Sequence, residues 1–443
     1  MSSNKSSKPL QAIPGSYGLS FFTPILDRLR YFYFQGEVKF FKTRAEEYKS
    51  TVFRTNMPPG PFLANDPHVI CLLDALSFQS RRETSLTGGY RVCAYLDPSE
   101  PKHAMNKRLL LSLLADRHAH FLPEFHAAFS KLFDGLDEGV GGPKKSADFN
   151  SLNDVSSFDF CCWAYFGMVA KWQFFQLHPQ LVLGRLPKIL EEIFLHTFPL
   201  PAFLVKSDYK KLYDYFSSAA SKVLDKAEAM GMKREEACHN ILFATCFNAY
   251  GALKVFFPDI MKWIGKAGEA LHKRLREEVR SIVKGEGGEI TVAGLEKMKL
   301  TKSVVYEVLR IEPPIKFQYA KAKKDFVLES HDASYEIKKG EMLFGYQPFA
   351  TKDPKVFADA EKFVPDRFVG DGAGMLGYVY WSNGRETDSP TDVNKQCPAK
   401  DFVVLVGRLL VAEFFMRYDS FTVEVGINPV GPAVGVTSLI KAA

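Results

Sequence analysis

A polar loop over 381–401, WSNGRETDSPTDVNKQCPAKD, contains one cysteine and is followed at once by the apolar run FVVLVGRLLVAEFF. This run predicts a long buried helix over about 400–418. A thiolate at a helix N-terminus is favoured by the helix dipole and by free backbone N–H groups. Cys397 can therefore be a nucleophile, a redox thiol or an axial metal ligand. The chain shows no His–Asn partner pattern for the nucleophile.

The other cysteines differ from Cys397 in their surroundings. The chain has seven cysteines, an odd number, and none of them are spaced as CxxC. Most lie in apolar runs, which is typical of small core residues. We expect neither a disulfide framework nor a zinc site, and we infer a reducing compartment.

Composition predicts a large globular fold without a nucleic-acid partner. Hydrophobic residues make up 46% of the 443, and a net charge of +6 is spread among acids without a basic stripe. No repeat or linker divides the chain, so we expect a single domain over 1–443. It should be mainly α with a smaller β portion.

The hydrophobic periodicity predicts the order of the elements. Strands and short helices are expected within 37–78, strands over 317–347 and a hairpin-like tail after 418. A long apolar helix over 233–256 should end at Pro258. The other helices are expected over 101–135, 154–174, 187–197, 207–231, 262–285 and, as two short ones, 291–311.

The N-terminal region bears on localisation. No run of 18 apolar residues occurs, so no transmembrane helix is predicted. The first 26 residues lack acids but form no clear transit peptide, which predicts an intracellular protein, plastid-associated or cytosolic. The segment FFTPILDRLRYFYFQGEVKFF could lie on a membrane surface as a peripheral contact, although ordinary packing is the favoured interpretation.

Three charged residues could form a buried network. In the predicted helix TKSVVYEVLRI, Glu307 and Arg310 are three apart and share a face. The turn FVPDRF presents Arg367 between two aromatic residues. Each feature alone is typical of a surface ion pair, but a network of all three would fix an architecture.

The order ExxR, then PxRF, then a Cys loop before a long helix resembles the cytochrome P-450 (haem-thiolate) superfamily. The resemblance implies haem b between a long distal helix and the Cys loop. It also implies that Cys397 is the proximal iron ligand. Glu307, Arg310 and Arg367 would then support the Cys loop.

Two departures from the general superfamily indicate a subgroup. The matching distal helix, ILFATCFNAYGALKV over 241–255, has no acid for delivering protons to oxygen, and it carries Asn248, whose amide can hydrogen-bond a peroxide. The long Cys loop is similar to the plant-type fatty-acid hydroperoxide-metabolising enzymes. So are LTGGYRVCAYLDPSEPKH and ESHDASYEIKKGEMLFGYQPFATKDP, among other stretches spanning nearly the whole chain.

Within that subgroup the chain is most like the allene oxide synthases. The resemblance implies an enzyme that dehydrates polyunsaturated fatty-acid hydroperoxides to allene oxides in oxylipin or jasmonate-type biosynthesis. It would use no O2, NADPH or reductase. By family position, His103, Lys107, Lys321 and Asn394 would contact the haem. The cations among them could equally be surface charges.

Three features leave other activities open. The segment 79–85, QSRRETS, is shorter than in relatives, and Arg81 or Arg82 could replace a missing cation. The chain is also short around CCWAYFGMVAKWQFF, and Ala399 replaces a usual glycine, where a methyl group could perturb the loop. Alternatives are a hydroperoxide lyase, a divinyl ether or epoxyalcohol synthase, a reductase-dependent monooxygenase, or a non-catalytic haem- or lipid-binding protein.

Overall fold

The computed structural model describes residues 8–19, 22–56, 69–72, 90–166, 203–427 and 431–442. Backbone contacts divide the chain into two compact units, each described here by itself. The first unit comprises Met1–Arg82, His178–Val205 and Ile315–Ala360. The second comprises Glu83–Leu177, Lys206–Pro314 and Glu361–Ala443. The single domain expected from the sequence remains a prediction.

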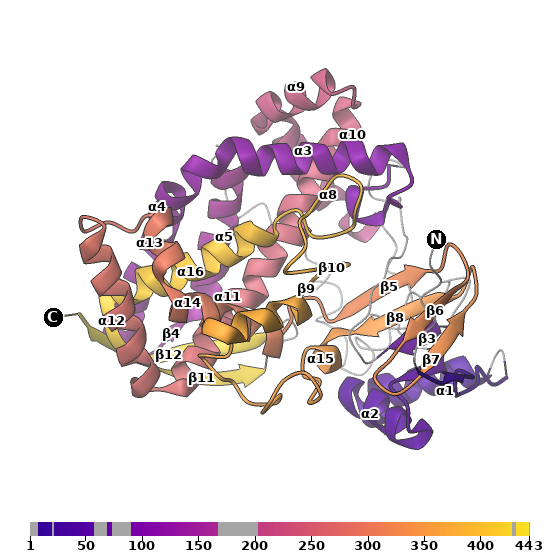
Figure 1. Ribbon diagram of the computed structural model, residues 1–443. Helices are drawn as coiled ribbons and strands as arrows, with labels where there is room; N and C mark the ends of the chain where they lie inside the picture. The colour runs from indigo at the N-terminus through magenta and orange to yellow at the C-terminus, as the bar shows by residue number, and fades with distance from the viewer. Residues whose placement is uncertain are drawn as a thin grey trace. The chain divides into compact units, whose positions relative to one another are not determined.

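The first unit contains two small sheets with a few helices (Figure 1). One sheet has the strand order β1-β7-β6 and the other β2-β3-β8-β5. Its strands are β1 (Leu10–Gln11), β2 (Val52–Thr55), β3 (Val69–Leu72), β5 (Phe317–Lys321), β6 (Phe326–Glu329), β7 (Ser334–Ile337) and β8 (Met342–Tyr346). Its helices are α1 (Phe22–Leu29), η1 (Arg30–Gln35), α2 (Glu37–Tyr48) and α15 (Gln347–Ala350). The strands predicted within 317–347 are thus present.

The second unit is mostly helical. Its first helices are η2 (Cys93–Tyr95), α3 (Pro101–Arg117), η3 (His118–His120), α4 (Phe121–Gly141), α5 (Phe149–Phe166), α8 (Phe203–Ala219) and α9 (Ser221–Ala229). The later ones are α10 (Arg234–Phe243), η5 (Ala244–Tyr250), α11 (Gly251–Ala267), α12 (Glu269–Gly285), α13 (Val292–Lys297), α14 (Lys299–Ile311), η6 (Gly370–Tyr378) and α16 (Lys400–Arg417). The predicted mainly α class is confirmed, and the helix predicted over 187–197 lies outside the described residues.

Short strands complete the second unit. The C-terminal strands β11 (Tyr418–Ile427) and β12 (Pro432–Lys441) form the predicted antiparallel hairpin, and β4 (Ala147–Asp148) pairs with β12. In the loop before α16, β9 (Tyr380–Trp381) pairs with β10 (Gly384–Arg385). This small ribbon fixes the path of the loop that carries Cys397.

The prediction that a helix ends at Pro258 is wrong. Elements α10, η5 and α11 form one continuous helix from Arg234 to Ala267, with Pro258 inside α11. A proline inside a helix removes a hydrogen bond and costs about 3 kcal/mol. Phe256, Phe257 and Ile260 around it are fully buried, and their burial outweighs that local cost.

This long helix also qualifies the expectation that no segment could cross a membrane. Within the described part of the chain, Arg234–Ala267 is one helix that passes such a test on length and apolar composition. Half of its most apolar stretch is buried inside the protein. Core helices of soluble proteins pass the same test, so the finding is weak support for a span.

Helix α16 lies in the core of the second unit, where it packs against α12 and α14. All its residues from Phe402 to Phe415 are buried, which explains why its sequence is apolar on almost every side. Helix α14 is equally buried from Thr301 to Ile311, apart from Lys302. The two helices therefore hold both Glu307 and the end of the Cys loop in a rigid part of the fold.

Candidate functional site

The structure brings Glu307, Arg310 and Arg367 together, as the sequence predicts. The Glu307 carboxylate accepts hydrogen bonds from Nε and Nη2 of Arg310, at 2.7 and 2.8 Å. The Nε of Arg367 lies 3.0 and 2.9 Å from the two oxygens of the same carboxylate. Glu307 and Arg310 are 0% exposed and Arg367 is 7% exposed.

Backbone groups complete this network. The backbone N–H of Val364 donates to Glu307 at 2.9 Å. The carbonyl oxygen of Lys362 accepts from Arg310 at 3.1 Å and from Arg367 at 3.2 Å. Buried charges are tolerated when they are paired and hydrogen-bonded in this way. The network therefore fastens the segment 362–367 onto α14.

Cys397 lies three residues before the start of α16, at the end of the polar loop. Its backbone N–H donates to the carbonyl of Trp381 at 3.2 Å, and its own carbonyl accepts from the N–H of Lys400 at 3.4 Å. Burial raises the pKa of the Cys397 thiol, whereas the backbone N–H of Ala399 and the charge of Lys107 lower it. Burial is the largest of these effects, so the pKa of the thiol is raised overall and the helix-terminus position offsets this only in part.

The expected disturbance from Ala399 is not found in the backbone. Ala399 has φ −95° and ψ 17°, a conformation open to residues with a side chain. No left-handed conformation requires glycine at this position. The backbone at Ala399 is therefore unstrained, and a disturbance of the loop by its methyl group stays a prediction.

Helix α3 binds the Cys loop directly (Figure 1). The ammonium group of Lys107 donates to the side-chain oxygen of Asn394 at 2.8 Å and to its backbone carbonyl. Nδ1 of His103 donates to the carbonyl of Asp392 at 3.0 Å. Asn394 also accepts from the backbone N–H groups of Thr391 and Gln396. Lys107 thus contacts Asn394 directly, and His103 binds the same loop two residues earlier, at Asp392.

The charges on this cluster depend on burial. Burial, with the charges of Lys395 and Lys107, lowers the pKa of His103 to about 4, so its imidazole is neutral at neutral pH. Burial lowers the pKa of Lys107 to about 8. A neutral His103 is a hydrogen-bond donor and no longer the cation that the resemblance implies. Its part in cofactor binding remains a prediction.

Sequence reasoning missed Lys395, two residues before Cys397. Its ammonium group donates to the carbonyls of Ala94 and Leu96, both at 2.8 Å, and to that of Cys93 at 3.3 Å. Burial lowers the pKa of Lys395, although nearby acidic groups oppose that effect. In the sequence it looks like any other lysine of a polar loop, so no local signal could have revealed this role.

The predicted distal helix has an irregular turn where Asn248 lies. Residues Ala244–Tyr250 are π-helical, a feature often found at functional sites. Asn248 is exposed, and within the described part of the chain its amide has no hydrogen-bond partner. Thr245 is buried and donates to the carbonyl of Ile241 at 2.9 Å. Its hydroxyl is therefore engaged by its own helix, which agrees with the absence of an acid–Thr pair.

The remaining predicted site positions are not part of this cluster. Lys321 is the exposed last residue of β5 in the first unit, so its role toward the cofactor remains a prediction. The short segment 79–85, with Arg81 and Arg82, lies outside the described residues. So does the segment from 167 onward in which a second shortening is expected.

The donor chemistry around Cys397 fits a haem. Among the described residues, no group of three or more His, Cys, Asp or Glu side chains could hold a metal ion by itself. A haem needs one axial protein ligand, and a single thiolate supplies it. The ammonium group of Lys107 adds a positive charge beside the same loop, which suits the acidic edge of such a group, whereas the neutral imidazole of His103 already donates its N–H to Asp392.

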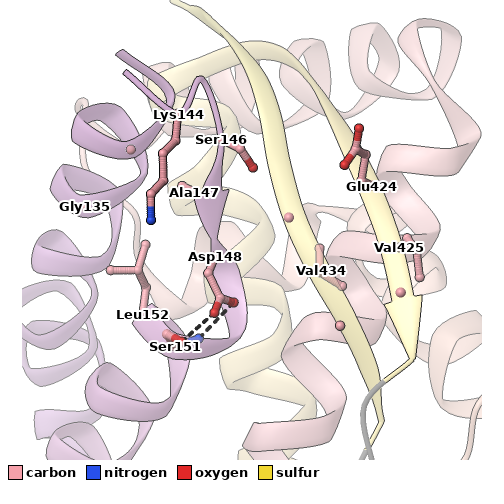
Figure 2. Close-up of a pocket in the computed structure, with 14 residues that line it drawn as sticks. Gly135, Lys144, Ser146, Ala147, Asp148, Ser151, Leu152, Glu424, Val425 and Val434 are labelled. Atoms are coloured by element: carbon pink, nitrogen blue, oxygen red, sulfur yellow. Dashed lines mark hydrogen bonds between the residues drawn. The ribbon is translucent and has the colours of Figure 1, made fainter. Parts of the chain in front are cut away.

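A separate hollow of about 730 Å³ lies in the second unit, between the α4–α5 connection and the β11–β12 hairpin (Figure 2). Its lining includes Lys144, Asp148 and Glu424 beside apolar Leu152 and Val434. None of the residues of the Cys397 site line it. Its lining combines apolar side chains with charges of both signs.

The buried Glu–Arg–Arg network on α14 and the loop with one cysteine before a core helix are together the features that indicate a haem-thiolate protein. The cytochrome P450 family model matches residues 269–380, which include both Glu307 and Arg367. Allene oxide synthase 1, chloroplastic, from Solanum lycopersicum is 52% identical over 98% of this chain and 87% of its own length. Allene oxide synthase 2 from Oryza sativa subsp. japonica is 54% identical over 94% of each chain.

The likeness extends to a third relative, allene oxide synthase, chloroplastic, from Arabidopsis thaliana. It is 50% identical over 98% of this chain and 90% of its own length. The chain belongs to the allene oxide synthase family of cytochromes P450. It is a haem-thiolate enzyme with iron bound through a cysteine thiolate.

The localisation expected from the sequence needs correction. That expectation kept the cytosol open, but the relatives from tomato and Arabidopsis are named chloroplastic. These names indicate the plastid.

Proposed function

We propose that this chain is a hydroperoxide dehydratase that converts polyunsaturated fatty-acid hydroperoxides into allene oxides and water. The observation that carries the proposal is identity of 50–54% to allene oxide synthases over nearly the whole chain. The acid-free helix around Asn248 supports it, because oxygen activation would need a proton relay there. Neither a reductase nor NADPH takes part.

The residues divide the work between holding the cofactor and placing the substrate. Bound haem supplies the one-electron chemistry that breaks the O–O bond of the hydroperoxide. Cys397 would be its axial ligand, and His103, Lys107 and Asn394 would hold the loop and the cofactor edge. The free amide of Asn248 would donate a hydrogen bond to the hydroperoxide and orient it.

A product assay tests this function. The purified holoenzyme is incubated with 9- and 13-hydroperoxides, without NADPH or reductase, and the products are analysed by mass spectrometry. Ketols formed by hydrolysis of an allene oxide are expected. Short-chain aldehydes as main products would instead identify a lyase, and a need for NADPH and a reductase would identify a monooxygenase.

A membrane surface is the proposed partner of the N-terminal helices. Helix α1 and the following π-helical turn expose Phe22, Leu26, Leu29 and Phe34, and Val38 continues the row on α2. Phe22 and Phe34 are 69% and 70% exposed. These five residues are called the N-terminal apolar face. Burying one such side chain is worth about 1.5–3 kcal/mol, so contact with an apolar surface would stabilise this face.

The opposite side of α1 is fixed by charge, which keeps this face pointing outward. Asp27 is 4% exposed and pairs with Arg44 at 2.5 Å. The amide of Asn56 donates to the same carboxylate at 3.1 Å. Helix α1 therefore buries the charged side chain of Asp27 while Phe22, Leu26 and Leu29 stay exposed. Ordinary packing, the interpretation favoured from sequence, accounts for Tyr31, Phe40 and Phe41, which are buried in one hydrophobic cluster, so the proposal concerns the N-terminal apolar face alone.

Positively charged residues on η1 and α2 indicate the lipid charge that the N-terminal apolar face would prefer. Arg30 and Lys42 are exposed, with 46% and 67% of the side-chain surface accessible, and each lies 4.0 Å from a carboxylate, that of Asp27 and that of Glu46. Glu37 is engaged by the hydroxyl groups of Tyr31 and Tyr346. An apolar face flanked by cations fits the surface of a bilayer that contains anionic lipid.

Vesicle flotation tests this contact. The holoenzyme should float with phosphatidylglycerol-containing vesicles and less with neutral vesicles. The double variant F22D/F34D should lose flotation, whereas V327D, a change at an exposed apolar residue of β6, should keep it. Equal flotation of both variants would contradict the proposal. A concentration-dependent dimer that F22D/F34D abolishes, without vesicle binding, would assign the face to self-association.

A further inference from the structure

We infer that Glu386, in the middle of the Cys loop, is the positioning residue that sets the place of Cys397. Its side chain is only 9% exposed although it belongs to a polar, solvent-facing loop. The inference rests on the proposed role of Cys397 as iron ligand. It gives the residues that lengthen the Cys loop a function, which is to position Cys397.

The Glu386 carboxylate collects donors from three elements. The hydroxyl group of Tyr306, next to Glu307 on α14, donates at 2.7 Å. The indole N–H of Trp381, on β9, donates to the other carboxylate oxygen. The ammonium group of Lys400, the first residue of α16, lies 3.2 Å from the first oxygen and 3.0 Å from the Glu386 carbonyl.

These contacts close a circuit of hydrogen bonds through Cys397. The backbone N–H of Cys397 donates to Trp381, whose indole donates to Glu386. Glu386 accepts from the side chain of Lys400, and the backbone N–H of Lys400 donates to the carbonyl of Cys397. Trp381 and Lys400, the two residues that hydrogen-bond the backbone of Cys397, therefore both donate to the Glu386 carboxylate. A displacement of the Glu386 carboxylate would therefore shift both partners of the Cys397 backbone and, with them, the thiol.

The rest of the loop is organised around the same point. The side-chain amide of Gln396, itself 1% exposed, donates to the carbonyls of Arg385 and Asp388 at 2.7 and 3.1 Å. A side chain on Gly384 would collide with Gln396 at 2.6 Å, so the ribbon packs tightly on the residue before Cys397. Hydrogen bonds and close packing therefore hold the loop together, and Glu386 connects the loop to α14 and α16.

Spectroscopy of the holoenzyme separates positioning from general stability. Glu386→Gln keeps the shape of the side chain, but its amide has a single acceptor oxygen and cannot accept from both Tyr306 and Trp381 as the two carboxylate oxygens do. Asp388→Asn is the matched control, because this exposed carboxylate of the same loop accepts, among the described residues, a hydrogen bond from the backbone N–H of Arg385 alone. Ferrous–CO spectra are recorded on protein shown by circular dichroism to be folded. They give the ratio of thiol-ligated to thiolate-ligated haem.

In E386Q this ratio should rise roughly tenfold, the effect of losing a hydrogen bond to a charged group. D388N should match the wild type. A merely structural role would lower the melting temperature of E386Q without changing the spectrum of its folded fraction. If E386Q does not fold, Tyr306→Phe removes a single donor and should shift the ratio in the same direction.

Wild-type spectra in both E386Q and Y306F would overturn the inference. A wild-type holoenzyme without a thiolate–haem spectrum would instead contradict the proposed role of Cys397. The two failures are therefore distinguishable.

Discussion

Replacing Glu307 by glutamine should destabilise the second unit more than any ordinary surface change. The carboxylate accepts five hydrogen bonds, four from the guanidinium groups of Arg310 and Arg367 and one from the N–H of Val364. The amide keeps one acceptor oxygen and turns an NH2 group toward those donors. Two guanidinium charges then remain in a site where Arg310 is 0% exposed.

The size of the effect follows from that burial. Breaking a buried ion pair while leaving its partner charged costs about 3–5 kcal/mol. Domains as a whole are stable by only about 5–15 kcal/mol, so the loss is a large part of the total. We expect the free energy of unfolding of E307Q to fall by about 3–5 kcal/mol.

Equilibrium unfolding in urea, followed by far-ultraviolet circular dichroism, measures this change. Glu277→Gln is the matched control, because Glu277 is 62% exposed and only 3.9 Å from Lys273 within one helix. It should change the free energy of unfolding by less than about 1 kcal/mol. If E307Q unfolds like E277Q, the network does not stabilise the fold and the reasoning is refuted.

Four further changes test the site and its surroundings. Cys397→Ala should remove the thiolate–haem spectrum while circular dichroism stays native, and a retained thiolate spectrum would contradict the assigned ligand. Asn248→Ala should lower kcat roughly 10- to 100-fold with haem still bound, as expected for one lost hydrogen bond of about 1–3 kcal/mol; unchanged kcat would remove Asn248 from the mechanism. Ala399→Gly should leave the haem spectrum unchanged, because its φ of −95° needs no glycine, and a shifted spectrum would restore the idea of strain. Burial lowers the pKa of His272 in the folded protein. Below about pH 6.5 the unfolded chain therefore binds a proton at this histidine that the folded protein does not bind, and the free energy of unfolding decreases as the pH falls. Urea unfolding of His272→Gln at several pH values should show a weaker loss, and an identical slope would contradict it.

Local sequence signals predicted most of the helices and strands. The two short helices within 291–311, the strands within 317–347 and the helix from 400 follow from periodicity and from Pro and Gly signals. Pro258 was misjudged because its local cost was visible and the burial of its neighbours was not. The sequence left open whether the apolar residues of α1 are packed or exposed, because an apolar stripe in a sequence does not say which way it points.

The sequence by itself determined the chemistry. The order of Glu307, Arg310, Arg367 and Cys397, the acid-free helix and the long Cys loop already predicted a haem-thiolate hydroperoxide enzyme. The spacing within one helix fixes which residues share a face, so the pair on α14 could be predicted.

Only the tertiary structure decided how the Cys loop is held. Lys395 binds carbonyls about 300 residues earlier in the chain, and Glu386 meets Tyr306 across 80 residues. A charged residue in a polar loop has the same local sequence whether it faces water or is buried against a distant helix. Burial and pairing of that kind arise only when segments far apart in the sequence pack together.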